Sequence, residues 1–490
     1  MTFPASNRAS ASTAEPIFRN LKSGGGQYVV PRIALIGQGA TASTFATTKA
    51  QVFSANDVGY AYGYGSPLHL AALELLPANG DGVGSIPVTV YPMDDAGSGV
   101  ASAGDITPSL SSQVLSTFRV RVNGIYSEPF NVLAADAVAD VVASMVVAIN
   151  AVPSMPVIAS NGTTTVTIAS KWKGVSANDI TLAVDGPTDA GVTWAFTQPV
   201  SGANNPTVDA SLAQIGPVWE MFVVNCLDPA DTTAMDTLAA ENVGRWDPQV
   251  WTPFVAVTGN GEATYATAVV VPDARPTDYT NVYATAQGSE SLPCQIAART
   301  VARLAKQANE NAATSYNGLK LDTIYPGTDA QQWSYAQRNA AINVGCSTST
   351  KEDGVVTIGD MVTFTHPTGE TDPAKRYVVA LVKLWNYIAR INTEFRGDNW
   401  RRTPLLPDDQ FSTNPLVKKP KDAVTAIAAI TDAAAGDALI ADPATAKASI
   451  TAAISGSNNN RIDWSVQIQI AGNTNIKAGT VYYGFFYGGN

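Results

Sequence analysis

The stretch that decides the fold is Val29–Ser43, VVPRIALIGQGATAS. Its short apolar run, Ile33 to Ile36, is followed by Gly37-Gln38-Gly39 and then by small residues. An apolar run of this length that ends in glycines indicates a buried β-strand followed by a tight turn. A turn of this kind also begins the nucleotide-binding βα unit, in which the glycines hold a phosphate. The turn therefore has two interpretations, one as a phosphate-binding loop and one as a structural turn.

The turn meets only part of the dinucleotide-binding pattern. Gly37, Gly39 and Ala42 satisfy the spacing of that pattern. The segment that follows, STFATTKAQVF, does not show the apolar seam of a helix. The first acidic residue after the turn is Asp57, and no clear second strand precedes it. We therefore expect the glycines to serve the geometry of the chain. A nucleotide-binding α/β enzyme that uses Gly37 and Gly39 stays as the alternative hypothesis.

Segments typical of strands and of helices alternate on both sides of this turn. Ser66 followed by Pro67 is typical of a helix start, and the apolar residues after them predict a helix that ends before Pro77. A buried-type strand, IPVTVYPM, follows this helix, and the alternation resumes much later with WEMFVVNCL. Alternation of this kind predicts an α/β domain.

Residues 104–205 have a different pattern. The stretch TFRVRVNG alternates with period two, and its Asn123-Gly124 pair is typical of a two-residue hairpin turn. One helical stretch, DAVADVVASMVVAINA, and three further strand-like runs follow. We interpret the segment as a β-rich domain inserted into the α/β domain. The predicted fold class is therefore α/β in the core and α+β overall.

A long amphipathic helix is predicted from Pro373 to Phe395, with a continuous apolar seam. Arg376, Lys383 and Arg390 follow one another at intervals of seven and form a basic stripe beside that seam. Between Pro373 and Lys421 the net charge is +6, whereas the remainder of the chain carries −17. The stripe either contacts an acidic partner or is a solvated helix face.

The two ends of the chain have unusual compositions. Residues 1–28 are polar and small and predict an extended arm. Near the other end, RIDWSVQIQI alternates with period two, and the chain finishes with GTVYYGFFYGGN. An exposed apolar strand recruits another strand, so this last strand either completes its own sheet or pairs with another chain.

The composition and the motifs of the chain contain few of the features that are typical of an active site. The chain has two histidines in 490 residues, and its three cysteines, Cys226, Cys294 and Cys346, are far apart. No HExxH, GxSxG or Walker sequence occurs, and no apolar run has the length of a membrane span. With a net charge of −11, non-specific binding to nucleic acid is not expected. We therefore expect that the protein is not an enzyme and that it has no catalytic residue, no cofactor and no metal site.

The order of several motifs resembles the contractile tail sheath proteins of Mu-like phages. The early stretches that carry the resemblance are IALIGQGATAS, YGYGSPLHLAALELL and VTVYPMDD. Further on, KGVSANDITL, NVGCSTSTKEDGVVTIGDMVTF and RINTEFRGDNW resemble later elements of that family. The resemblance covers most of the chain, and its order matters more than any one motif.

The resemblance implies a structural subunit of the virion tail, assembled in the host cytoplasm. Such subunits form hexameric rings that stack helically around a tail tube and contract to drive the tube through the host cell envelope. The implied partners are further copies of the chain, the tail tube protein, and baseplate and tail terminator proteins, with no direct contact to nucleic acid or membrane. A different self-assembling tail or capsid component is a further alternative.

The resemblance also assigns expected roles to the arms and to the basic stripe. The expected strand-donating residues are Val481, Tyr483, Phe485 and Tyr487. The expected tube-facing residues are Arg376, Lys383 and Arg390. The expected organisation is an N-terminal arm at 1–28, an α/β sheath domain at 29–103 and 206–370, an inserted β-rich outer domain at 104–205, an inner domain at 371–480, and a C-terminal strand arm at 481–490.

Overall fold

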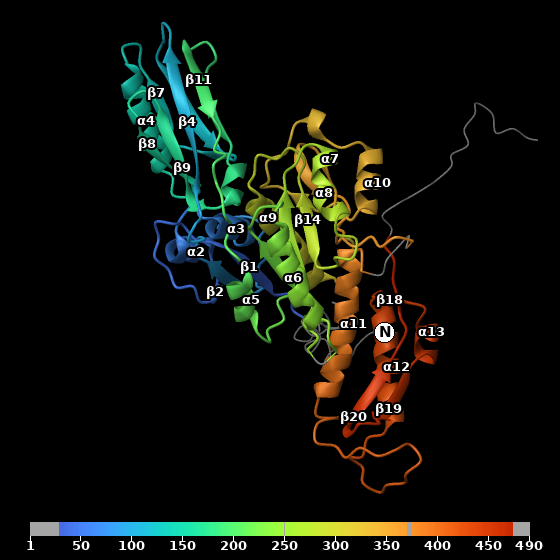
Figure 1. Ribbon diagram of the computed structural model, residues 1–490. Helices are drawn as coiled ribbons and strands as arrows, with labels where there is room; N and C mark the ends of the chain where they lie inside the picture. The colour runs from blue at the N-terminus through green and yellow to red at the C-terminus, as the bar shows by residue number, and fades with distance from the viewer. Residues whose placement is uncertain (1–28, 249, 370–374, 474–490) are drawn as a thin grey trace, which may run out of the picture. The chain divides into compact units, whose positions relative to one another are not determined.

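The computed structural model describes residues 29–248, 250–369 and 375–473 (Figure 1). Helices and sheets are mixed throughout, which confirms the predicted α+β class. The chain forms two compact units. Among the described residues, the larger unit comprises 29–310 and 318–381, and the smaller unit comprises 311–317 and 382–473. Both predicted arms, 1–28 and 481–490, lie outside the described residues.

A six-stranded sheet forms the centre of the larger unit, with the strand order β14-β13-β12-β1-β3-β2. All neighbouring strands are parallel except β2, which runs antiparallel to β3. The strands are β1 (Ile33–Gln38), β2 (Ala50–Val52), β3 (Val88–Met93), β12 (Phe222–Asn225), β13 (Val255–Asn260) and β14 (Asn281–Thr285). The predicted opening strand is thus β1, in the interior of the sheet between β3 and β12.

Helices cover both faces of this sheet, which explains why β1 is apolar on both of its sides. Ala34 and Ile36 pack in one core cluster with residues of α5 and α6. On the other face, α3 contacts β1, and α9 contacts β12 and β13. A strand buried on both faces reads as a continuous apolar run. The helices of this unit outside the insert are α2 (Ala55–Tyr62), α3 (Pro67–Leu75), α5 (Asp209–Ile215), α6 (Thr232–Arg245), α7 (Tyr265–Ala268), α8 (Val270–Asp273), α9 (Pro293–Glu310) and α10 (Tyr335–Asn343).

The helix start predicted at Ser66 is confirmed. Ser66 Oγ accepts a hydrogen bond from the backbone N–H of His69 at 3.2 Å, and Pro67 occupies the first helical position of α3. The side chain therefore satisfies one of the N–H groups that a helix start leaves without a partner.

The β-rich segment between β3 and α5 contains two four-stranded sheets. One has the order β11-β4-β9-β8; in the other, β5 pairs with β10, β6 and β7. The elements are β4 (Ala101–Leu110), β5 (Ser116–Val122), β6 (Ile125–Tyr126), β7 (Phe130–Val132), α4 (Val138–Asn150), β8 (Val157–Asn161), β9 (Val166–Lys173), η1 (Val175–Asp179), β10 (Leu182–Asp185) and β11 (Val192–Thr197). The predicted hairpin turn is confirmed: Asn123 and Gly124 join β5 to β6, with φ values of 47° and 79°.

A small antiparallel sheet completes the larger unit. Its strand order is β15-β17-β16. The elements are β15 (Lys320–Leu321), η2 (Asp329–Gln331), β16 (Ser349–Glu352) and β17 (Val355–Ile358).

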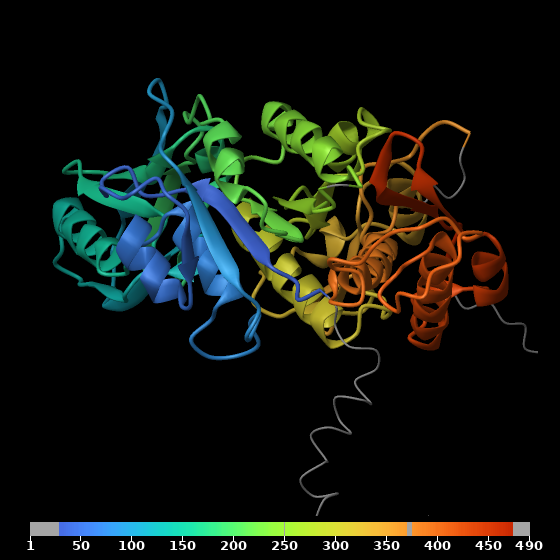
Figure 2. The ribbon, with the colours of Figure 1, turned by 90° about the horizontal axis from the view of Figure 1, so that it is seen from below.

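The predicted long helix is α11 (Val378–Arg396), and most of it belongs to the smaller unit. In that unit, coloured orange to red in Figures 1 and 2, α11 packs against α12 around Tyr387, Ile391 and Ile427. The remaining elements are α12 (Pro420–Gly436), β18 (Ile440–Ala441), α13 (Pro443–Ala448), β19 (Thr451–Ser455), β20 (Asn458–Ser465) and β21 (Gln469–Ile470).

The alternating stretch near the chain end forms two short strands. β20 pairs with β19, and β21 pairs with β18. Trp464, Val466 and Ile468 pack against the core of the smaller unit, so the apolar side of the stretch faces inward as its alternation predicts. Within the described ranges, no helix is long and apolar enough to cross a membrane.

Candidate functional site

The glycines of the opening turn are required by close packing. A Cβ atom at Gly37 would lie 2.9 Å from Cβ of Cys226, and one at Gly39 would lie 2.3 Å from a ring carbon of Phe45. Neither glycine has a positive φ. In addition, residues 39–49 form no helix, and the next element is strand β2. A phosphate-binding turn needs a helix whose N-terminus begins at the last glycine. The geometry therefore supports the structural interpretation.

The end of β1 is occupied by a polar link to the β-rich insert. Gln38 is buried, and its Nε2 donates to Asp95 Oδ1 at 2.7 Å and to the Lys173 carbonyl at 2.6 Å. The backbone N–H of Lys173 donates to the same carboxylate oxygen at 3.2 Å, and Thr41 Oγ1 donates to Asp95 Oδ2 at 2.5 Å. Open α/β sheets bind ligands outside the carboxyl ends of their strands. Here protein side chains fill that position beside β1 and connect three distant segments.

A hollow of about 530 Å³ lies beyond the ends of β3 and β12, next to the start of α6. Its lining includes Asp209, Asp228 and Asp231 but no lysine or arginine. Asp231 caps α6: Oδ1 accepts from the N–H of Ala234 at 3.0 Å, and Oδ2 accepts from Asn205 at 2.7 Å. Carboxylates at a helix N-terminus already use its positive end, so they disfavour a phosphate there.

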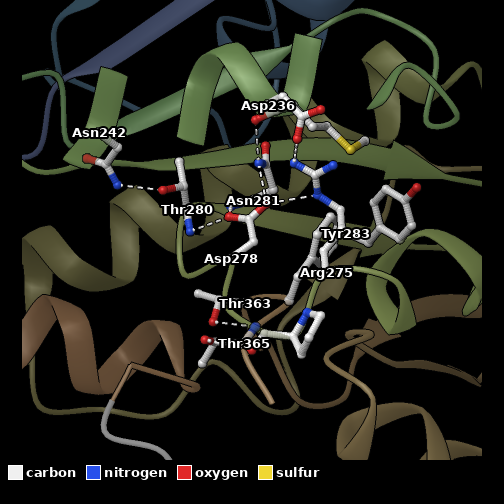
Figure 3. A network of polar contacts seen from close by, with 12 residues as sticks. Asp236, Asn242, Arg275, Asp278, Thr280, Asn281, Tyr283, Thr363 and Thr365 are labelled. Carbon is white, nitrogen blue, oxygen red and sulfur yellow. Dashed lines mark hydrogen bonds and ion pairs between the residues drawn. The ribbon is translucent and has the colours of Figure 1, made fainter. Parts of the chain in front are cut away.

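A polar network supports the edge strand β14 (Figure 3). Asp278 is its centre: one of its carboxylate oxygens accepts from the N–H groups of Thr280 and Asn281 at 2.9 and 3.1 Å, and the other accepts from Arg275 at 3.1 Å. Arg275 also pairs with Asp236 of α6 at 2.6 Å. The network holds the entry to β14 against α6.

The outer edge of β14 is partly covered by residues 362–365. Val282 forms an antiparallel bridge with Thr363, and the N–H of Phe364 donates to the Asn281 carbonyl at 3.1 Å. An unpaired edge strand is a site for adding another chain. Although β14 is the edge strand, some of its backbone groups are therefore already paired with residues 362–365.

His69 and Asp179 are among the titratable side chains whose pKa values are strongly shifted. Burial and the nearby Lys171 lower the pKa of His69 to about 4, and Nδ1 of His69 accepts from the N–H of Gly65 at 3.1 Å. Burial, with the nearby carboxylates of Asp228 and Glu262, raises the pKa of Asp179 to about 7. Among the described residues, no three His, Cys, Asp or Glu side chains are grouped so that they could hold a metal ion.

The structure buries the predicted basic stripe. Arg376, Lys383 and Arg390 are 6%, 1% and 5% exposed. Nζ of Lys383 donates to the Ala471 carbonyl at 2.6 Å, and Arg390 pairs with Asp437 at 2.6 Å. The spacing of seven predicts that the three side chains lie on one face of α11. It cannot show that other segments of the chain pack over that face. In the single chain these side chains form no basic surface, and their contact with a tube stays a prediction.

The smaller unit contains two short sheets. Within residues 375–473, β18 and β21 form one two-stranded sheet, and β19 and β20 form the other. The expected strand-donating residues Val481, Tyr483, Phe485 and Tyr487 lie outside the described residues. Strand donation by them therefore also stays a prediction.

Comparison of the sequence with known proteins identifies a relative. No protein-family model matches the chain. A segment of 277 residues is 23% identical to the Mu-like prophage FluMu tail sheath protein of Haemophilus influenzae. The chain is similar to a Mu-like tail sheath protein. The match covers 55% of this chain and 55% of the relative, so the resemblance inferred from the motif order is confirmed over about half of each protein.

Solved structures of tail sheath proteins are also similar to the chain. The sheath tail proteins of Listeria innocua and Desulfitobacterium hafniense each have a TM-score of 0.46 to it, with 14% and 12% sequence identity. These comparisons cover 90% and 91% of this chain and 92% and 98% of the other chains. The contracted helical sheath of the anti-feeding prophage has a TM-score of 0.44 and 11% identity, and covers 94% of each chain.

Proposed function

We propose that this protein is a structural subunit of a contractile tail sheath. The observation that carries the proposal is the sequence match to the Mu-like tail sheath protein. On this proposal, copies of the chain form hexameric rings that stack helically around a tail tube. Contraction of the stack drives the tube through the host cell envelope. Two alternative packings of one subunit give a bistable interface of the kind that such a movement requires.

The two-stranded sheets of the smaller unit support strand exchange between copies. An isolated pair of strands is marginally stable, and each added strand satisfies backbone groups on an open edge. The final residues of the chain, VYYGFFYGGN, have the aromatic composition that strands favour. We infer that Val481, Tyr483, Phe485 and Tyr487 lie in a strand that is donated to a neighbouring copy.

The remaining partners follow from the same proposal. The subunit would contact the tail tube protein, and the ends of the sheath would contact baseplate and tail terminator proteins. It would be located in the virion tail after assembly in the host cytoplasm, without direct contact to nucleic acid or membrane. The domain organisation expected from the sequence belongs to this proposal too. The structural role of Gly37 and Gly39 supports a subunit that is not a nucleotide-dependent enzyme.

Electron microscopy of the purified full chain tests the proposal. We expect long, wide hollow cylinders. Discrete particles whose melting temperature rises on addition of a nucleotide would instead support the α/β enzyme that uses the Gly37 turn. Closed shells or narrow tubes would support a different tail or capsid component.

A further inference from the structure

The buried basic residues of α11 are followed along the chain by exposed basic residues, and these exposed residues could bind a partner. We call residues 396–421, which run from the last residue of α11 into the first turn of α12, the basic loop. It has six lysines and arginines and three aspartates, a net charge of +3. Arg396, Arg401, Arg402 and Lys421 are exposed. In the part of the chain that the structure describes, the guanidinium groups of Arg401 and Arg402 have no hydrogen bond and no ion pair, so both are free to bind an acidic group.

Two strands of chain within the basic loop, at residues 404–406 and at residue 418, are held together by backbone hydrogen bonds. The N–H of Lys418 donates to the Pro404 carbonyl at 2.8 Å, and the N–H of Leu406 donates to the Lys418 carbonyl at 3.1 Å. Nζ of Lys419 donates to the Gln410 carbonyl at 2.5 Å. Loops with closed ends and internal hydrogen bonds are compact surface structures that frequently carry a function. Figure 1 shows this segment projecting beyond the end of α11.

Large apolar side chains are exposed in the same loop. Phe411 is 85% exposed and Leu416 is 61% exposed. Asn414 fixes the backbone before Leu416, because its Oδ1 accepts from the N–H of Leu416 at 3.0 Å. Aromatic residues and arginines are enriched in protein interfaces and in the few positions that dominate binding energy. The combination with Arg401 and Arg402 is therefore the composition of a contact surface.

The charge distribution of the chain indicates the partner. Residues 29–310 and 318–381, which form the larger unit, contain 16 lysines and arginines and 31 aspartates and glutamates, a net charge of −15. A basic loop on one part of a chain and a large excess of carboxylates on another part carry opposite charges, which attract each other between copies. We propose that the basic loop of one copy docks on the acidic larger unit of a second copy. Arg401 and Arg402 would form the ion pairs, and Phe411 and Leu416 would be buried between the copies. This inference rests on the self-assembly in the proposed function.

Sedimentation velocity of the full chain tests this contact. We expect R401E/R402E to weaken association by at least about tenfold at low salt, because two ion pairs become repulsive. F411S should weaken association by about tenfold as well, but equally at low and high salt. The single variants R401E and R402E are compared with R119E, because Arg119 in β5 is also exposed and its guanidinium also has no partner among the described residues. Circular dichroism checks that each variant is folded.

The outcomes separate the loop contact from the sheath proposal. If R401E/R402E associates like the wild type, or if R119E weakens association as much as R401E, the loop contact is wrong. If R401E/R402E loses only binding to another acidic protein and still self-associates, the second copy is the wrong partner. If the wild type forms no cylinders but shows salt-sensitive association that R401E/R402E loses, the sheath proposal fails and the loop contact stands. A wild type that does not associate at any salt concentration overturns both.

Discussion

Lys383 and Asn473 are joined by a hydrogen bond of 2.8 Å from Nζ of the lysine to Oδ1 of the asparagine. The same ammonium group donates to the Ala471 carbonyl at 2.6 Å, and Asn473 Nδ2 donates to the Ala313 carbonyl at 2.8 Å. Lys383 is 1% exposed. A buried ammonium is tolerated when acceptors satisfy it. The lysine therefore anchors the segment that leads to the predicted donated strand, and this is a stabilising role within the chain.

Replacing this lysine should destabilise the smaller unit. We expect K383M to lower the free energy of unfolding by about 1–3 kcal/mol, because the Ala471 carbonyl and the Asn473 amide lose a buried partner. Urea unfolding measures this loss. K447M is the matched control: the Lys447–Asp432 pair is 2.7 Å long but exposed, and its loss should cost less than about 1 kcal/mol. Equal losses in the two variants would mean that Lys383 is not an anchor.

Deletion of Val481–Asn490 should separate folding from assembly. We expect the truncated chain to keep its melting temperature within a few degrees but to form no cylinders, because the donated strand is missing. Microscopy and thermal unfolding give the two readouts. Serine at Val481, Tyr483, Phe485 and Tyr487 should reproduce the loss, whereas serine at Tyr482 and Phe486 should be milder. A truncated chain that fails to fold would show that the strand belongs to its own core.

Alanine at Gly39 should be destabilising because the space for a Cβ atom is filled. We expect G39A to cost about 1–3 kcal/mol in unfolding free energy. F45A in the same chain should recover part of this loss, because the ring carbon at 2.3 Å is removed while the Tyr62 carbonyl at 2.9 Å remains. G97A is the control, since no atom lies within 4 Å of a Cβ at that position. Nucleotides should leave the melting temperature of the wild type unchanged, and a rise would revive the phosphate-binding interpretation.

Asp179 should make the stability of the protein depend on pH. Its pKa is raised to about 7 in the folded chain, from an ordinary value near 3.8, chiefly by burial. The folded chain therefore binds this proton more tightly than the unfolded chain, and the stability falls as the pH rises from about 4 to about 7. We expect D179N to stabilise the protein, with a gain roughly 1–2 kcal/mol larger at pH 8 than at pH 5.5.

Urea unfolding at the two pH values measures this difference. D189N is the control, because Asp189 is exposed in the same β-rich segment. The gain from D179N at each pH is compared with the effect of D189N at the same pH. A gain from D179N that does not change with pH would contradict the assignment of the raised pKa to Asp179.

Local patterns in the sequence determined several elements of this protein. The apolar run at Ile33–Ile36 is a buried strand, Ser66 and Pro67 begin a helix, and Asn123-Gly124 joins two strands. Each of these three elements depends on residues that are close together in the sequence. Their periodicity, capping and turn residues can therefore be recognised in the sequence. The family resemblance was visible too, because it lies in the order of such motifs.

The tertiary structure alone decided what those elements contact. Gln38 reaches Asp95 and Lys173, which is 135 residues away along the chain, so no local pattern could show that the end of β1 is filled. From the sequence, Lys383 and Arg390 are expected at the surface, because charged side chains are usually exposed to solvent. Their partners Ala471 and Asp437 are brought to α11 only by packing, and a charge can be buried only where folding supplies such partners.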